Sequence, residues 1–537
     1  MRARRGPVGM LVAVGLAAAL TTVPVAPAAA AGTDVVRLAG DDRYATAVAV
    51  ARAGAGTAGL SDRTRPVVVG GEDFPDALSA VNLLAGGRGA VVLGREGGLP
   101  TESAELLTDL ADRPAWVLGS TDVLSPALAA QVAASRPGQD VRRLGGADRY
   151  ATNELTVAET YDARSAPAGT MQGRRTGILV SGTAFADALS AGPLATRERL
   201  PLVLTAPGAL SPSAARSLRQ AGVQQVLVVG GAQAVPDAVL EQVRSLGMTV
   251  RRVAGGDRQA TAVAVADLAR QDFGWVPGRV LLADGRRFAD ALAGAGRGGA
   301  LGAPVLLTAG PGDLGTATRA WLRRDGGALT RVEVLGGPSS VSADLLEQVR
   351  VAARPAAVEA VTAADLGASW RPGCPVGPAD LRRVTVPTVD LAGRARTGSI
   401  VVHADVAAAT VRIFDDLYVA GFPVASMRPV EAFGGSDDAS MAADNTSAFN
   451  CRQAVGSTRF SEHSYGTAID LNPVENPYVR GATVLPAAGR AHLVRTPAPG
   501  RVVAGDATVQ TFQRNGFRWG GAWTSLKDYQ HFSVTGR

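Results

Sequence analysis

The segment RLAGDDRYAT at residues 37–46 recurs twice along the chain with small changes. The copies are RLGGADRYAT at residues 143–152, which begins 106 residues after the first, and RVAGGDRQAT at residues 252–261, 109 residues further on. This spacing is the size of a duplicated domain and exceeds that of a solenoid unit. The first two thirds of the chain is therefore predicted to hold three related domains.

Each copy continues in the same order, with an apolar run, a glycine turn, the pattern Phe-x-Asp-Ala-Leu, a second apolar run and a closing Val/Leu strand. The pattern stands at residues 74–78, 185–189 and 288–292. The apolar runs are continuous, as in strands of a parallel sheet that are buried on both faces. Ala/Leu-rich stretches of helical period separate them, which is typical of α/β layers. We expect three α/β lobes with layered parallel sheets, at residues 35–135, 141–245 and 250–350.

Composition and charge narrow the class of protein. The chain has 537 residues, of which 46% are hydrophobic and 19% charged, so it can form packed cores and is not a disordered chain. The formal net charge of +6 is small and spread out, whereas nucleic-acid binding requires a basic face or stripe. We expect no nucleic-acid partner, and only weak attraction to an anionic polymer.

The N-terminus has the features of a secretory signal peptide over residues 1–31. Arg2, Arg4 and Arg5 supply the positive region, Val8 to Leu20 an apolar run, and Ala28 to Ala31 small residues for cleavage. The run is shorter than the roughly 20 residues of a membrane-spanning helix. We expect a secreted protein with no stable membrane span after signal removal, whose mature charge is +3 once the three arginines are gone.

The chain has two cysteines, Cys374 and Cys451. In an exported protein a lone pair of cysteines favours a disulfide. Two free buried thiols are the alternative. A metal role is less favoured, because neither cysteine belongs to a CxxC pair.

The RxxGxDRYxT opening, the FxDAL turn and the closing VLGG strand resemble the type 2 cell-wall-binding repeat. This resemblance covers residues 35–350 and implies a three-lobed α/β module that binds anionic secondary cell-wall polymers without a covalent link. Arg43, Arg149 and Arg258 are candidate wall-polymer contacts, because guanidinium groups suit bidentate anion binding. The alternative is that each arginine pairs with the aspartate that precedes it.

The last third differs in composition. Residues 351–372 are Ala-rich, carry none of the repeat motifs and are predicted to be a linker, so that the last domain spans 373–537. Strands are expected at 385–389 and 399–402. Val406 to Gly421 is expected to form an amphipathic helix.

Two short stretches carry the chemistry, SEHSYGTAIDLNP at residues 461–473 and KDYQHF at residues 527–532. We expect a bent strand or hairpin that turns His463 and Asp470 inward. Together with His531 they form a ligand set that suits zinc and leaves a position open for water. Asp528, three residues before His531, is the natural general base.

The surrounding pattern, SxHxxGxAxD followed by DxxHF, resembles the VanY-type zinc D-alanyl-D-alanine carboxypeptidases. The stretches FGGSDDAS at 433–440, NTSAFNCR at 445–452 and FRWGGAW at 517–523 extend the match. The resemblance implies an α+β zinc peptidase domain with a small antiparallel sheet. It also implies a role for seven residues: zinc binding by His463, Asp470 and His531, acid/base catalysis by Asp528, carbonyl polarisation by Arg452, substrate binding by Ser461, and a cleft wall at Trp519.

We therefore expect a secreted, wall-associated zinc metallopeptidase that hydrolyses peptidoglycan stem peptides, as a D-alanyl-D-alanine carboxypeptidase. Many carboxypeptidases of the family carry Glu where Asp528 stands, which leaves an L-alanyl-D-glutamate endopeptidase as an alternative. The other alternative is a non-catalytic surface protein that binds the wall.

Overall fold

The computed structural model describes residues 33–53, 64–87, 89–276, 278–454 and 457–537. The expected signal peptide at residues 1–31 lies outside the described residues. Within them, no helix combines the length and the hydropathy that crossing a membrane requires.

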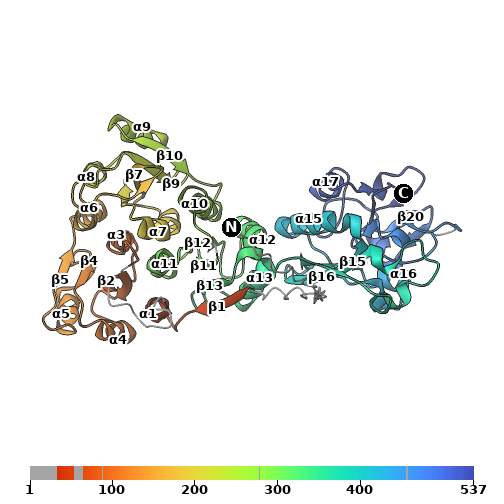
Figure 1. The fold of residues 1–537 in the computed structure, drawn as a ribbon, viewed down its shortest axis with the longest axis horizontal. Helices are drawn as coiled ribbons and strands as arrows, with labels where there is room; N and C mark the ends of the chain where they lie inside the picture. The colour runs from red at the N-terminus through yellow and green to blue at the C-terminus, as the bar shows by residue number, and fades with distance from the viewer. Residues whose placement is uncertain (1–32, 54–63, 88, 277, 455–456) are drawn as a thin grey trace, which may run out of the picture. The chain divides into compact units, whose positions relative to one another are not determined.

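Three parallel sheets form the repeat region, as the continuous apolar runs predict (Figure 1). The inner strands of these sheets are almost entirely buried, whereas the edge strands β1 (Asp34–Leu38), β5 (Val141–Leu144) and β10 (Thr249–Val253) are partly exposed. A short antiparallel strand, β6 (Thr170–Met171), borders β7. The sheets are, in strand order, β3 (Gly89–Gly94), β2 (Arg65–Gly70), β4 (Ala115–Leu118) and β5 (Val141–Leu144); β10 (Thr249–Val253), β9 (Gln225–Val229), β7 (Arg174–Ser181) and β8 (Leu202–Thr205); and β1 (Asp34–Leu38), β13 (Arg331–Leu335), β11 (Arg279–Asp284) and β12 (Val305–Thr308).

The opening strand of each copy belongs to the sheet of another copy. β5 opens the second copy and pairs with β4 of the first, and β10 opens the third and pairs with β9 of the second. β1 of the first copy pairs with β13 of the third. The three copies are thereby closed into a ring by backbone hydrogen bonds, and each sheet is shared by two copies.

The repeated motifs begin the helices. α1 (Arg43–Ala53), α6 (Arg149–Thr160) and α10 (Arg258–Phe273) each start at the repeated arginine. Helices α2 (Pro75–Leu78), α3 (Ala80–Leu83), α7 (Phe185–Glu198) and α11 (Phe288–Leu301) start in or follow the FxDAL motif, and α3, α7 and α11 lie in the middle of the three sheets (Figure 1). The remaining helices of this region are α4 (Thr101–Asp109), α5 (Pro126–Ala134), α8 (Pro212–Gln220), α9 (Asp237–Ser245), α12 (Thr316–Asp325), η2 (Gly326–Ala328) and α13 (Ala343–Ala353).

The phenylalanines of the three FxDAL motifs meet one another. The ring centroids of Phe74 and Phe185 are 5.4 Å apart, and Phe288 lies 6.3 Å from Phe74 and 6.4 Å from Phe185. Each copy of the motif therefore contributes one of the three rings of a shared aromatic cluster.

The segment predicted to be a linker is folded. β14 (Ala357–Ala360) pairs antiparallel with β15 (Leu381–Val389), which pairs with β16 (Ala395–His403). α14 (Ala363–Leu366), η3 (Gly367–Ser369) and η4 (Pro378–Asp380) lie between β14 and β15. The four residues of β14, Ala-Val-Glu-Ala, do not have a sequence pattern typical of a strand. They are extended because they pair with the free edge of β15.

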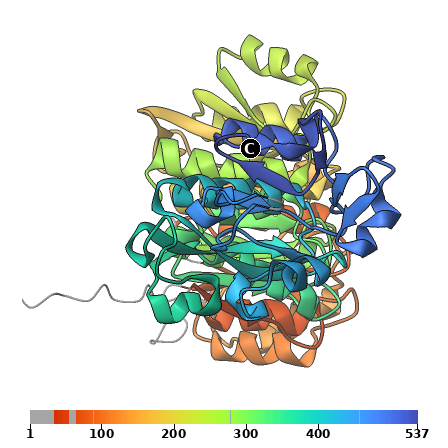
Figure 2. The same cartoon turned by 90° about the vertical axis from the view of Figure 1, so that its right-hand side faces the viewer.

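The expected helix is α15 (Ala404–Ala420), which ends at Gly421 in a left-handed conformation with φ 71°. Figure 2 shows the chain's C-terminus among the blue elements of the last domain. Its other short sheets join β19 (Ala468–Asp470), β24 (His531–Ser533) and β22 (Arg518–Trp519); β21 (Thr483–Leu485), β20 (Tyr478–Arg480) and β23 (Lys527–Asp528); and β17 (Ser426–Met427) with β18 (Asn445–Thr446). The helices are α16 (Asp437–Ala442), α17 (Ala507–Arg514), η5 (Val430–Phe433), η6 (Glu462–Tyr465), η7 (Ala487–His492) and η8 (Gly520–Ala522).

Candidate metal centre and the cleft around it

Two antiparallel strands bring two of the expected metal ligands together. β19 ends at Asp470 and β24 begins at His531, and the strand register places these two residues opposite each other. His463 lies in η6, and Gly466, with φ 70°, turns the chain from η6 into β19. The approach of His463 is thus a short 3-10 helix and a glycine turn, where a bent strand or hairpin was expected.

The ligand atoms of these three residues converge. His463 Nε2 lies 3.2 Å from Asp470 Oδ2 and 3.2 Å from His531 Nδ1, and His531 Nδ1 lies 3.0 Å from Asp470 Oδ1. All three side chains are buried, and they form a group that could hold a metal ion. Two imidazoles and one carboxylate are the donor set of several catalytic zinc sites.

The second nitrogen of each imidazole has its own partner. His463 Nδ1 is 2.6 Å from the main-chain oxygen of Ala448, and His531 Nε2 is 2.8 Å from that of Arg537. A carbonyl oxygen only accepts, so each of these nitrogens carries the hydrogen and leaves the opposite nitrogen free for a metal. The residues therefore fit a zinc ion, with Nε2 of His463 and Nδ1 of His531 as ligand atoms.

The carboxyl groups at the site differ in acidity. Burial opposes ionisation of Asp470, but the attraction and hydrogen bonds of His463 and His531 outweigh it and hold the pKa of Asp470 well below its usual range. Burial raises the pKa of Asp528 to about 7. Asp528 Oδ1 is buried without a hydrogen-bond partner among the described residues. One carboxyl is therefore suited to bind a cation, and the other to exchange a proton.

Arg452 has a partner that sequence reasoning missed. Its Nη2 lies 2.9 Å from Asp437 Oδ2, in the first turn of α16. Burial raises the pKa of Asp437, and the charge of Arg452 opposes that rise. Asp437 belongs to the stretch FGGSDDAS at 433–440, which the resemblance includes, but no pattern in that stretch distinguishes Asp437 from Asp438.

A cavity of about 350 Å³ contains the site. Ser461 lies on its wall, where its hydroxyl accepts the main-chain N–H of His463 at 3.3 Å. Trp519 was expected on this wall, but it is 7% exposed, packs in the core and donates to the main-chain oxygen of Tyr529 at 2.8 Å. Trp523 lines the cavity instead, together with Asp437, Arg452, Arg459, His463, Asp470, Tyr478, Asp528, His531 and Arg537, among others.

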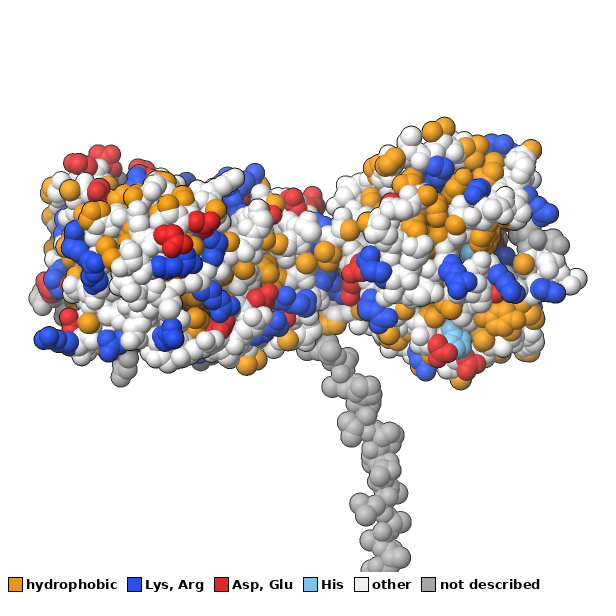
Figure 3. All heavy atoms as spheres, turned by 90° about the horizontal axis from the view of Figure 1, so that it is seen from above, with side chains coloured by type: hydrophobic (Ala, Val, Ile, Leu, Met, Phe, Trp, Pro, Cys, Tyr) orange, Lys and Arg blue, Asp and Glu red, His pale blue; other side chains and the backbone are white. Residues whose placement is uncertain are grey.

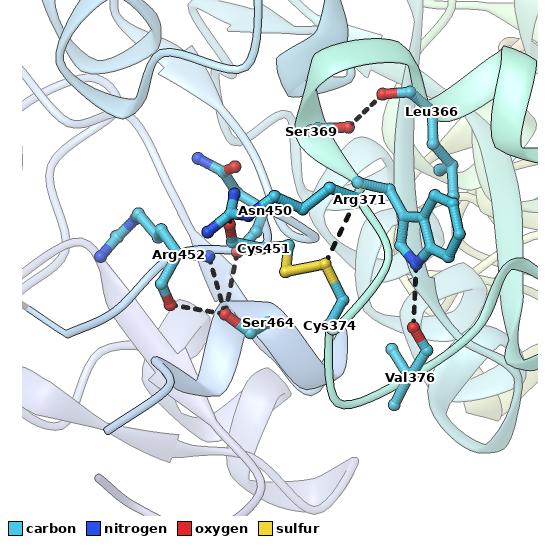
Figure 4. The surroundings of a disulfide bond; sticks show 10 residues. Leu366, Ser369, Arg371, Cys374, Val376, Asn450, Cys451, Arg452 and Ser464 are labelled. Atoms are coloured by element: carbon cyan, nitrogen blue, oxygen red, sulfur yellow. Dashed lines mark hydrogen bonds between the residues drawn. A yellow bond between two sulfur atoms is a disulfide. The ribbon is translucent and has the colours of Figure 1, made fainter. Parts of the chain in front are cut away.

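The predicted disulfide between Cys374 and Cys451 is confirmed (Figure 4). It anchors the residue before Arg452, while the Ser464 hydroxyl donates to the main-chain oxygen of Arg452 at 2.6 Å and accepts its N–H at 2.9 Å. Arg371 donates to the main-chain oxygen of Cys451 at 2.9 Å. The loop that carries Arg452 is therefore held from both sides.

Comparison with known families decides what the chain is. A model of cell wall binding domain 2 (CWB2) matches residues 37–129, 143–240 and 252–346, which together make up more than half of the chain. The chain belongs to the CWB2 family. A peptidase family described as D-alanyl-D-alanine carboxypeptidase, of the M15 type, matches residues 455–534. The predicted order, three CWB2 repeats followed by a carboxypeptidase-like domain, is confirmed.

Two curated proteins of Bacillus subtilis (strain 168) are similar to parts of the chain. The N-acetylmuramoyl-L-alanine amidase LytC is 32% identical over 202 residues, which are 38% of this chain and 37% of that protein. An amidase enhancer is 31% identical over 167 residues, 31% of this chain and 21% of that protein. The chain thus spans 37% of the length of the first relative and 21% of the length of the second.

A solved structure shares the fold. Cwp6 from Clostridium difficile superposes with a TM-score of 0.51 at 21% identity, covering 59% of this chain and 48% of that one. The expected parallel sheets of the CWB2 repeats and the small antiparallel sheet near the C-terminus are both present.

The repeated arginines of the CWB2 repeats follow one pattern. Arg43 donates to the main-chain oxygen of Gly71 at 2.6 Å, and its guanidinium lies 6.0 Å from the Phe288 ring centre. Arg149 donates to the main-chain oxygen of Gly182 at 2.8 Å, and its guanidinium carbon lies 5.9 Å from the Phe74 ring centre. Arg258 donates to the main-chain oxygen of Gly285 at 2.6 Å.

The aspartates that precede these arginines cap the helices that follow. Asp42, Asp148 and Asp257 accept main-chain N–H groups in the first turn of α1, α6 and α10. These bonds cap the helices and do not pair the aspartates with the arginines. On the face seen in Figure 3, cationic and acidic side chains are scattered, with no basic stripe.

Proposed function

We propose that this protein is a secreted, wall-attached zinc metallopeptidase that removes D-alanine from peptidoglycan stem peptides as a D-alanyl-D-alanine carboxypeptidase. The observation that carries the proposal is the convergence of His463, Asp470 and His531 in a cavity that also holds the carboxyl of Asp528, whose Oδ1 is buried without a hydrogen-bond partner among the described residues. A purely wall-binding domain would have no need for this combination.

His463 Nε2, His531 Nδ1 and a carboxylate oxygen of Asp470 would hold the metal ion. Zinc bound there supplies Lewis acidity, which polarises the scissile carbonyl and makes a water molecule a stronger acid. The hydrogen bonds to Ala448 and Arg537 keep both imidazoles in the tautomer that binding requires.

Asp528 takes the proton of the attacking water and returns it to the departing amine. Its pKa near 7 suits both halves of that transfer, because a group that gains and loses a proton in one cycle works best near the ambient pH. Arg452, held by Asp437, points its positive charge at the cavity and stabilises the negative charge that develops on the carbonyl oxygen. Ser461 binds the substrate backbone at the cavity wall.

The CWB2 repeats bring the peptidase to its substrate. They bind an anionic secondary cell-wall polymer through Arg43, Arg149 and Arg258, of which Arg43 and Arg149 lie beside the shared phenylalanines. Tethering to the wall raises the effective concentration of stem peptides around the cavity.

A second candidate activity is L-alanyl-D-glutamate endopeptidase, which an aspartate at position 528 favours. The similarity to LytC, which is named as an amidase, adds cleavage next to muramic acid as a third outcome to be checked.

Mass spectrometry of peptidoglycan digested by the full chain tests the proposal. We expect loss of terminal D-alanine, abolished by a chelator and restored by zinc. Asp528→Asn should be inactive, whereas Asp438→Asn, an exposed aspartate of α16, should match the parent protein. Cleavage between L-alanine and D-glutamate would replace the carboxypeptidase by the endopeptidase, and intact muropeptides with a zinc-loaded protein would refute the peptidase.

A further inference from the structure

The last residues of the sequence reach back to one of the metal-site histidines. The main-chain oxygen of Arg537 lies 2.8 Å from His531 Nε2, on the side of the ring opposite the nitrogen that faces Asp470 and His463. His531 is itself 5% exposed, so water has little access to replace that acceptor. The orientation of this imidazole therefore depends on a residue six positions further along the chain.

The segment from Ser533 to Arg537 is built as a turn around one hydroxyl. Ser533 is completely buried, and its Oγ donates to the Arg537 oxygen at 2.9 Å. The same Oγ accepts the N–H groups of Gly536 and Arg537, both at 3.1 Å. Gly536, with φ 79°, takes a left-handed conformation that favours glycine at this bend.

Trp523 fixes the turn from outside. Its indole Nε1 donates to the main-chain oxygen of Gly536 at 2.9 Å, and its ring centre lies 5.5 Å from that of His531. Trp523 also lines the cavity. The turn, the tryptophan and the histidine thus form one packed unit behind the metal centre.

We infer that the 533–537 turn is a positioning element of the metal centre, which selects the His531 tautomer and its ring angle through the Arg537 main-chain oxygen. A metal-binding imidazole whose distal N–H is bound to an oxygen is oriented and made more basic, and loss of such partners typically weakens metal binding about 10- to 100-fold. The main-chain oxygen of Arg537 orients the His531 imidazole, so the Arg537 side chain is not needed for that orientation. The inference rests on the proposed zinc site.

Zinc affinity of the full chain, measured by competition with a chromophoric chelator, tests the inference. Ser533→Ala removes the hydroxyl that shapes the turn, and deletion of residues 535–537 removes the acceptor. Both are expected to weaken zinc binding about 10-fold or more. Thr535→Ala, at an exposed residue of the same turn that does not line the cavity, is the matched control, and it should bind zinc like the parent protein because it keeps the main-chain oxygen of Arg537.

A second readout separates positioning from stability. In ¹⁵N NMR of the zinc-loaded parent, His531 Nε2 should carry the hydrogen, and its resonance should shift in Ser533→Ala but not in Thr535→Ala. If both turn variants fold and keep the parent's zinc affinity, the inference is wrong, whatever their melting temperatures. Failure of the parent itself to bind zinc would instead overturn the proposed function.

Discussion

The CWB2 region and the peptidase-like domain are built on opposite principles. In the CWB2 region the same short motif starts a helix three times, and the inner strands of all three sheets are buried apolar runs. In the peptidase-like domain each functional group occurs once, on strands of two or three residues and on loops held by a disulfide. The first region is redundant, whereas the second depends on contacts that no other part of the described residues duplicates.

The largest effect should come from one proposed metal ligand, because the described residues hold no second copy of this group. His463→Ala is expected to abolish zinc uptake and to lower peptidase activity about 10⁴-fold, since Lewis-acid stabilisation is worth several kcal/mol and each 1.36 kcal/mol is tenfold in rate. Zinc content and D-alanine release measure this. His492→Ala, a histidine outside the three ligands, is the control, and full activity in a zinc-free His463→Ala protein would contradict the proposed chemistry.

Removal of the disulfide tests whether the peptidase-like domain needs this covalent link for its stability and activity. Cys374 and Cys451 are 77 residues apart, and closing such a loop stabilises the folded state by at most about 4.5 kcal/mol in the chain-entropy model. Cys451→Ser should therefore lower the thermal midpoint measured by calorimetry. Because the bridge anchors the loop of Arg452, the variant should also lose activity below its melting temperature. The double variant Cys374→Ser/Cys451→Ser should behave alike, and an unchanged midpoint in both would count against the role of the bridge.

Because the CWB2 region carries three copies of the motif, we predict that wall binding weakens step by step as more of the repeated arginines are removed. Arg43→Ala alone should weaken binding to purified cell walls only a few-fold, whereas the triple variant at residues 43, 149 and 258 should weaken it about 10²-fold, as expected when several contacts to one polymer are lost. Co-sedimentation with walls measures both. Arg244→Ala, on the exposed face of α9, is the control. Equal losses in the single and triple variants would show that the three copies do not share the task.

The smallest effect should come from a helix cap. Asp148→Ala removes the acceptor for the Ala151 N–H at the start of α6, which should cost about 1 kcal/mol of unfolding free energy in urea denaturation. Asp140→Ala, an exposed aspartate that caps no helix, should cost close to nothing. A similar loss in both variants would mean that the repeated aspartate has no special part in starting the helix.

The sequence pattern predicted which segments form strands and helices more accurately than it predicted which strands pair with one another. The continuous runs predicted buried parallel strands, and the helix at 406–421 is found as α15. The exchange of β5, β10 and β1 between copies was not predicted, because these short, partly exposed edge strands mix arginines with apolar residues, and such a pattern does not specify which sheet a strand joins. The pairing of β14 was missed for a related reason, since its four residues become a strand only beside β15.

The amino-acid sequence by itself determined which residue types stand at the proposed metal site, since two histidines and two aspartates in those motifs already give the proposed donor set and the proposed base. Only the tertiary structure decided which nitrogen of each imidazole faces the site, that Asp437 holds Arg452, and that Trp523 and not Trp519 lines the cavity. Residue type is local information, whereas the direction of a side chain depends on partners that are distant along the chain. The Arg537 oxygen behind His531 is the clearest case.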